Sequence, residues 1–163
     1  MSIPMDPLLE LLQANSSRTP AELAHALGTT ADDVSTRIAA AEAAGAILGY
    51  QAVVDHSKEA ERGVTALIEV KISPEQGGGF DRLARRISQY SQVRDCKLMS
   101  GDYDLAVLVE GKDLYDVARF VSEKLSTLRG VLSTGTLFEL KVYKQAGFIV
   151  DHGEQEQRLP VTP

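Results

Sequence analysis

The chain has 163 residues, a net charge of −6 and 44% hydrophobic residues. These values are ordinary for a globular protein and exclude global disorder, collagen-like chains and disulfide scaffolds. The acidic balance argues against a basic nucleic-acid coat protein, and the single cysteine, Cys96, excludes an intrachain disulfide. There is no apolar run of membrane-spanning length and no visible signal peptide, so we expect a cytoplasmic protein that contacts no membrane.

Residues 1–54 predict a helix-turn-helix domain. A capping side chain precedes each of three helical segments: Asp6 before Pro7, Thr19 before Pro20, and Thr29 or Thr30 before an acidic first turn. Glycines at positions 28 and 45 end the second and third segments. A helix, a short helix, a glycine-containing turn and a further helix are typical of helix-turn-helix motifs. The alternation over 47–54 then predicts a strand.

The remainder of the chain predicts a polar linker, a second domain and a tail. Residues 55–63 are polar and charged, and residues 151–163 form a tail that we expect to fray. Between them we expect strands over 64–72, 93–100, 103–110 and 136–143, with helices over 80–90 and 114–125. This βαββαβ order over 64–150 is the ferredoxin-like arrangement, so the predicted fold class is α+β.

Several short segments accompany this order of elements: Arg37-Ile38 with Glu42, residues 45–50, residues 100–104, and Gly130-Val131 with Thr134 and Thr136. Together they resemble the Lrp/AsnC family, the feast/famine transcription regulators of bacteria and archaea. The resemblance covers about residues 5–145. It implies double-stranded DNA as a partner, a small amino-acid-like effector bound by the second domain, and self-assembly into dimers and octamers of four dimers.

The predicted DNA-binding residues lie on the third helix and its cap. Arg37 is the one basic residue between positions 29 and 46, and residues 1–60 carry three basic and eight acidic groups, a net charge of −5. Phosphate contacts supply much of the affinity of DNA-binding proteins, so this half lacks the usual basic surface. The alternative is a regulatory or interaction protein of the same fold that has lost DNA affinity. The candidate contacts are Thr30, Ser35, Thr36 and Arg37.

The resemblance implies an effector site where a turn of one subunit meets a strand of its neighbour, and the residue types there fit such a ligand. The turn offers backbone N–H groups to a ligand carboxylate and ionised aspartates to an ammonium group, and threonine hydroxyls offer further donors. The same residues are also common turn and strand formers, which leaves a purely structural role open. The candidate residues are Ser100, Gly101, Asp102, Tyr103, Asp104, Thr134 and Thr136.

Three other features have a structural and a functional interpretation. Arg82, Arg85 and Arg86 share a helix and form either a solvated basic face or a contact with a partner or nucleic acid. The glycines at positions 77–79 open that helix and form either a flexible loop or an anion site. Cys96 lies in an apolar strand and is expected to be a small core residue.

Catalytic patterns are weak. The histidines His25, His56 and His152 lie in different segments, and none has metal-ligand spacing with Cys96. Haem-pathway decarboxylases resemble the same two-domain architecture, but the stretch that matches their histidine-bearing motif, residues 93–98, has no histidine. We therefore predict no enzymatic activity, no metal and no cofactor.

The second domain is expected to form an obligate oligomer. Two helices cover one face of a four-stranded sheet, and apolar residues occur at both alternating sets of positions in its strands, as in the segment 105–109. The second apolar face then needs a partner sheet.

Overall fold

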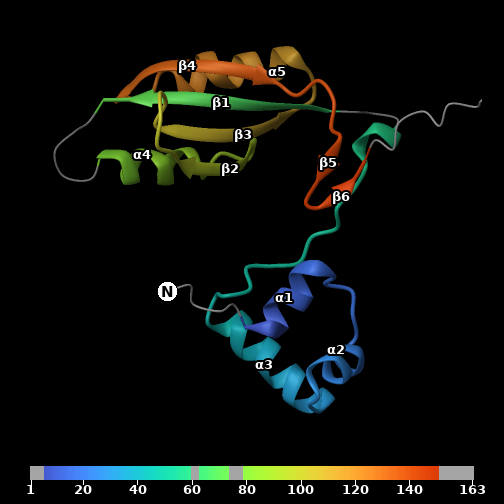
Figure 1. The fold of residues 1–163 in the computed structure, drawn as a ribbon. Helices are drawn as coiled ribbons and strands as arrows, with labels where there is room; N and C mark the ends of the chain where they lie inside the picture. Colours follow the sequence, from blue (N-terminus) through green and yellow to red (C-terminus); the bar gives the residue numbers. More distant parts are fainter. Residues whose placement is uncertain (1–5, 60–62, 74–78, 151–163) are drawn as a thin grey trace, which may run out of the picture. The chain divides into compact units, whose positions relative to one another are not determined.

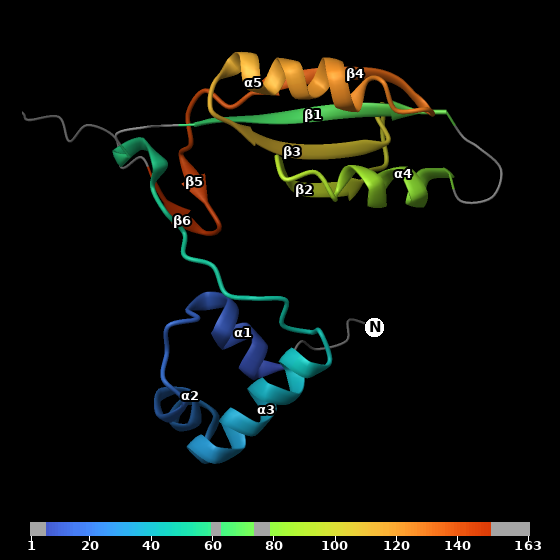
Figure 2. The same ribbon diagram turned by 180° about the vertical axis from the view of Figure 1, so that it is seen from behind.

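The structure, a computed structural model, describes residues 6–59, 63–73 and 79–150. The chain divides into two compact units, residues 1–52 and residues 53–163. The first unit is built from helices and the second from a sheet with helices (Figures 1 and 2). The division precedes the segment 55–63 predicted as a linker, in which His56–Lys58 (η1) forms a short 3-10 turn.

Three helices form the first unit, as the capping residues predict. Helix α1 spans Pro7–Ala14, α2 spans Pro20–Leu27 and α3 spans Ala31–Ala43. The Thr19 hydroxyl accepts from the Glu22 N–H while the Glu22 carboxylate accepts from the Thr19 N–H, so α2 begins with a full capping box. The apolar faces pack into one core made by Leu8, Leu12, Leu23, Ala24 and Val34.

The strand predicted over 47–54 is wrong for the single chain. These residues form neither helix nor strand. Ile47 packs against the core of the first unit, whereas the large apolar side chains after it are exposed, Leu48 by 96%. Alternation favours an extended strand only where a second strand supplies hydrogen bonds, and no strand of the described residues pairs with this segment.

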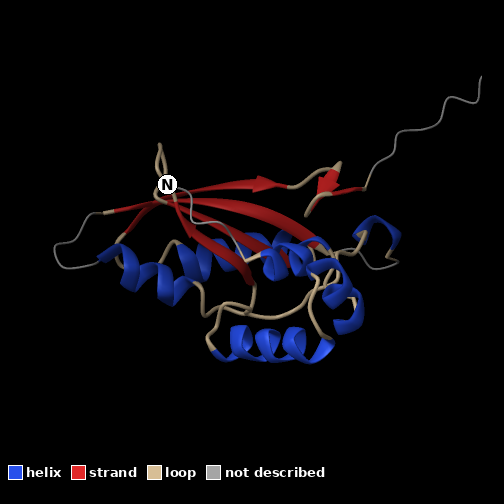
Figure 3. Ribbon diagram, turned by 60° about the horizontal axis from the view of Figure 1, so that its bottom comes forward, coloured by secondary structure: helices blue, strands red, loops and turns tan. Residues whose placement is uncertain are grey.

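The second unit contains a four-stranded antiparallel sheet in the order β2-β3-β1-β4. Its strands are β1 (Val64–Ile72), β2 (Val93–Leu98), β3 (Leu105–Gly111) and β4 (Val131–Phe138). Helix α4 (Gly79–Ile87) follows β1, and α5 (Leu114–Arg119) continues into a π-helical turn η2 (Phe120–Leu125) before β4. Figure 3 shows both helices on one side of the sheet. The βαββαβ order and the α+β class are confirmed.

The alternation of burial along β1 separates the two faces of the sheet. Ala66, Ile68, Val70 and Ile72 are buried against the helices, and the core also includes Leu83 and Ile87 of α4. Residues at the intervening positions of β1, Leu67, Glu69 and Lys71, lie on the other face, which we call the open face.

The last predicted strand is placed wrongly. Strand β4 spans 131–138 rather than 136–143, because it pairs with β1 from Ile72↔Val131 to Ala66↔Phe138. Gly130, with φ of 97°, turns the chain into this register. The residues that follow form a small hairpin, β5 (Lys144–Gln145) with β6 (Phe148–Ile149), which the sequence did not predict. The predicted tail, 151–163, and glycines 77 and 78 lie outside the described residues.

Candidate functional site

The four predicted DNA-binding residues lie between the N-cap and the middle of α3, and each is used within the helix-turn-helix unit. Thr30 is the N-cap, and its hydroxyl accepts from the Asp33 N–H at 3.2 Å. The hydroxyls of Ser35 and Thr36 each donate to the carbonyl four residues earlier at 2.8 Å. All three side chains are exposed, so their oxygens remain open to a further donor.

The Arg37 guanidinium links α3 to the start of α1. Its Nη2 lies 2.7 Å from Oδ1 of Asp6, and its Nη1 lies 3.6 Å from Oδ2 of Asp33. The same Asp6 oxygen accepts from the Leu8 N–H, so the carboxylate both caps α1 and holds the arginine. The hydrogen bond from Leu8, with Arg37 as a smaller cause, lowers the pKa of Asp6. Arg37 therefore holds two elements together and is 36% exposed for any contact outside the chain.

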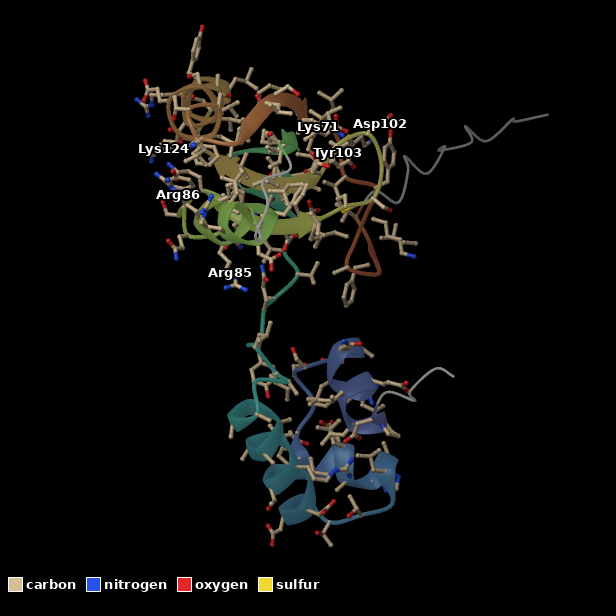
Figure 4. All side chains as sticks on the ribbon, turned by 90° about the vertical axis from the view of Figure 1, so that its left-hand side faces the viewer. Lys71, Arg85, Arg86, Asp102, Tyr103 and Lys124 are labelled. Atoms are coloured by element: carbon tan, nitrogen blue, oxygen red, sulfur yellow. The ribbon has the colours of Figure 1, made fainter. Side chains whose placement is uncertain are left out.

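The turn predicted as half of the effector site is held to the end of β1. Oδ2 of Asp104 accepts from the Ile72 N–H at 2.7 Å, and its Oδ1 lies 3.8 Å from Nζ of Lys71. Lys71 Nζ also donates to the Asp102 carbonyl at 2.8 Å. Figure 4 shows Lys71, Asp102 and Tyr103 near one another. The Lys71 ammonium, the Asp104 carboxylate and the backbone of Asp102 thus lie together at this end of the sheet.

The two aspartates of the turn have different surroundings. Asp104 is half-buried and bonded to the backbone, which makes it part of the sheet's framework. The Asp102 side chain is exposed and makes no hydrogen bond or ion pair within the described part of the chain. Asp102 rather than Asp104 therefore has a carboxylate available to a ligand ammonium.

The structure does not bring Thr134 and Thr136 to the turn within one chain. They lie opposite Val70 and Ile68 on β1, so they share the helix-covered face. The Thr134 hydroxyl lies 3.3 Å from that of Ser126, at the end of η2. The Lys71–Asp104 pair lies on the open face, so only a second subunit could add threonines like these to the turn.

Sequence reasoning missed Lys71. A charged residue between Val70 and Ile72 marks the exposed side of a strand, which the alternation alone could have shown. Its contact with Asp104, 33 positions later in the chain, depends on the pairing of Val70 with Leu105. That pairing is not encoded in any short segment.

Metal and thiol chemistry find no support in the part of the chain that the structure describes. There, no three histidine, cysteine or acidic side chains are grouped to hold a metal ion. Cys96 packs against the core, as predicted, and burial raises the pKa of its thiol. Among the described helices, none is long and apolar enough to cross a membrane.

Comparison with known proteins decides the family. Residues 65–148 match the family model described as the Lrp/AsnC ligand binding domain. The chain is 43% identical over 157 residues to the uncharacterized HTH-type transcriptional regulator YugG of Bacillus subtilis, covering 96% of this chain and 95% of that one. This protein belongs to the Lrp/AsnC family. It is thus a helix-turn-helix transcriptional regulator with a ligand-binding domain.

More distant relatives and solved structures agree with this family. The proline dehydrogenase transcriptional activator of Rhizobium radiobacter is 25% identical over 140 residues, covering 86% of this chain and 89% of that one. The leucine response regulatory protein LrpA of Mycobacterium tuberculosis has a TM-score of 0.71 at 19% identity, covering 90% of this chain and 100% of its own. The transcriptional regulator NMB0573 of Neisseria meningitidis, solved as a complex with L-Met, has a TM-score of 0.69 at 23% identity, covering 91% and 99%. At these identities the structures establish the shared fold.

Proposed function

We propose that this Lrp/AsnC regulator senses a small amino acid through the end of its sheet and binds DNA through α3. The observation that carries the sensing proposal is the contact of Lys71 with the Asp104 carboxylate and the Asp102 carbonyl, next to the exposed side chain of Asp102. The Lys71 ammonium attracts a ligand carboxylate, and the Asp102 carboxylate attracts a ligand ammonium. The NMB0573 complex with L-Met, a neighbour of the same fold, supports an amino acid as the ligand class.

The proposed site is completed by a second copy of the chain. Thr134 and Thr136 of the neighbouring subunit supply hydroxyl donors to the turn of Ser100, Gly101, Tyr103 and the two aspartates. A ligand held between subunits favours the assembly that contains the complete site, so effector and oligomer are reciprocally coupled.

Calorimetry with the twenty amino acids, on wild type and on Asp102→Asn, tests this site. We expect at least one amino acid to bind and the variant to weaken it about ten-fold, because a charged hydrogen bond is lost. The matched control is Asp81→Asn, which removes an exposed carboxylate on the helix side of the same domain. If Asp102→Asn binds as tightly as wild type, Asp102 is a turn residue only, and if no amino acid binds, the ligand is of another class.

Self-association through the open face accounts for its apolar side chains. Leu67, Ala106, Leu108 and Leu137 lie on this face among charged residues, and Leu137 is 50% exposed. Burial of such a face against a second sheet removes apolar area from water. Light scattering at micromolar concentration is expected to show dimers or larger closed assemblies such as octamers, and a stable monomer would contradict the proposal.

DNA binding by α3 is the second half of the proposal, and Arg37 is the contact we expect to matter most. Arg37→Ala should weaken binding to a selected DNA fragment about ten-fold, since a specific arginine contact contributes about 1–3 kcal/mol. Asp6→Asn is the matched control, because it removes the Asp6 carboxylate that pairs with Arg37, while asparagine at this position can still cap α1. Binding that is unchanged in Arg37→Ala would remove Arg37 as the contact.

A regulator that acts without binding DNA is the alternative. It is favoured by the net charge of −5 over residues 1–60 and by the two carboxylates that already hold Arg37. Selection of genomic fragments by the purified protein at low salt separates the two functions. Enriched fragments support the DNA-binding regulator, whereas their absence, with and without amino acids, supports the alternative.

A further inference from the structure

A pocket of about 370 Å³ lies on the helix side of the sheet, where β1 ends and α4 begins. Ile72 and Leu83 supply its apolar base, and both are buried. The side chains of Arg82, Arg86 and Arg129 complete the lining together with Ser73 and Gly130. The pocket therefore combines an apolar base with three guanidinium groups in a protein whose net charge is −6.

The fold itself gathers these three cations. Arg82 and Arg86 are four residues apart on α4, which places them on one face of the helix. Arg129 approaches from the segment before β4, and the Ser73 N–H fixes that segment by donating to the Gly130 carbonyl at 2.8 Å. Two elements far apart in the sequence thus bring like charges to one concave site.

The lining of this pocket offers the Arg86 guanidinium to a ligand. Among the described residues that line it, none is acidic. The Arg86 side chain has no hydrogen bond or ion pair to any described residue, whereas Arg82 and Arg129 each make a further interaction in the chain. Arg86 can therefore donate to an anion in the pocket, and the positive charges of the other two arginines in the lining attract the same anion.

We propose that this pocket binds a small phosphate-bearing molecule as a second ligand of the protein. Guanidinium groups match the geometry of phosphate oxygens with paired, charge-assisted hydrogen bonds, and several arginines favour a ligand with more than one negative charge. The volume is that of small-molecule sites, and Ile72 and Leu83 can contact an apolar or planar part of the same ligand.

This pocket is distinct from the proposed amino-acid site. Consecutive residues of a strand point to opposite faces, so Ile72 lines the pocket while Lys71 reaches the Asp102–Asp104 turn on the open face. Figure 4 shows Arg86 and Lys71 on different sides of the sheet. A phosphate-bearing ligand and an amino acid could thus bind one subunit together.

Calorimetry with pyrophosphate on the full chain at low salt tests the proposal. Arg86→Ala removes the guanidinium that has no partner among the described residues, and Arg85→Ala removes the same charge one position earlier, outside the pocket lining. We expect pyrophosphate to bind wild type, Arg86→Ala to weaken it at least ten-fold, and Arg85→Ala to weaken it less than two-fold. Circular dichroism checks that both variants fold, and Asp102→Asn should leave pyrophosphate binding unchanged.

Several results would overturn the proposal. An equal loss in Arg85→Ala and Arg86→Ala would show attraction to the general charge of α4 rather than a site. Citrate binding as tightly as pyrophosphate would show that charge alone, not phosphate, is recognised. If a DNA duplex displaces pyrophosphate, and if both variants bind that duplex equally weakly, the surface binds a nucleic-acid backbone instead. If wild type fails to bind pyrophosphate, the pocket is not an anion site.

Discussion

Replacement of Asp104 by alanine tests whether this residue stabilises the sheet rather than only a ligand. The change removes the acceptor of the Ile72 N–H, a 2.7 Å bond to a half-buried carboxylate, and the carboxylate of the Lys71 pair at 3.8 Å. A hydrogen bond to a charged group contributes about 1.5–3 kcal/mol, and an ion pair with this exposure contributes at most about 1 kcal/mol. We expect a loss of about 2 kcal/mol, or about 4–8 °C in melting temperature for a chain of this size.

Thermal denaturation at one fixed protein concentration measures this loss, since self-association shifts the apparent stability. Asp104→Asn keeps a side-chain acceptor and should lose about 1 kcal/mol or less. Asp102→Ala is the control, because its exposed side chain makes no bond among the described residues, and it should stay within about 0.5 kcal/mol of wild type.

Hydrogen exchange at one amide locates the effect. The Ile72 N–H should exchange faster in Asp104→Ala than in wild type, whereas the amides of α1 should be unchanged. A melting temperature within 1 °C of wild type, together with unchanged exchange at Ile72, would refute the structural role of Asp104.

Three other measurements test separate features. Gly111→Ala should destabilise the second unit by about 1–3 kcal/mol in urea denaturation, because the added Cβ would lie 2.8 Å from Cγ2 of Val117. An unfolding midpoint equal to that of wild type would contradict this close packing. The pKa of Asp6 is lower in the folded protein than its unfolded value of 3.8, so its stabilising contribution is complete above that value and is lost as pH falls through the folded pKa. Between pH 5 and 3 the melting temperature should therefore fall more steeply in wild type than in Asp6→Asn. Parallel pH profiles of the two proteins would contradict this prediction. Binding to a selected DNA fragment should depend weakly on salt concentration, because residues 1–60 carry only three basic groups that could displace counterions from DNA. A steep fall of affinity with salt in filter binding would place the basic contacts elsewhere, as on the arginines of α4.

The sequence alone determined the helices of the first unit and most of the second fold. Asp6, Thr19 and Thr30 cap the helices as predicted, because a capping side chain bonds to backbone groups two or three residues away. The strand over 64–72 was predicted at its observed bounds, since a face buried against helices leaves a strict alternation of burial. The family resemblance stated from the residues was confirmed by the comparisons.

Only the tertiary structure decided which distant residues meet. The position of β4 depends on its pairing with β1, and the segment 47–54 has no described strand to pair with, so alternation alone misplaced one strand and predicted another that does not form. Strand register likewise joins Lys71 to Asp104, and the hydrogen bond between Ser73 and Gly130 brings Arg129 to the pocket of Arg86. These contacts are long-range, and long-range pairing depends on how whole elements pack rather than on the preferences of neighbouring residues.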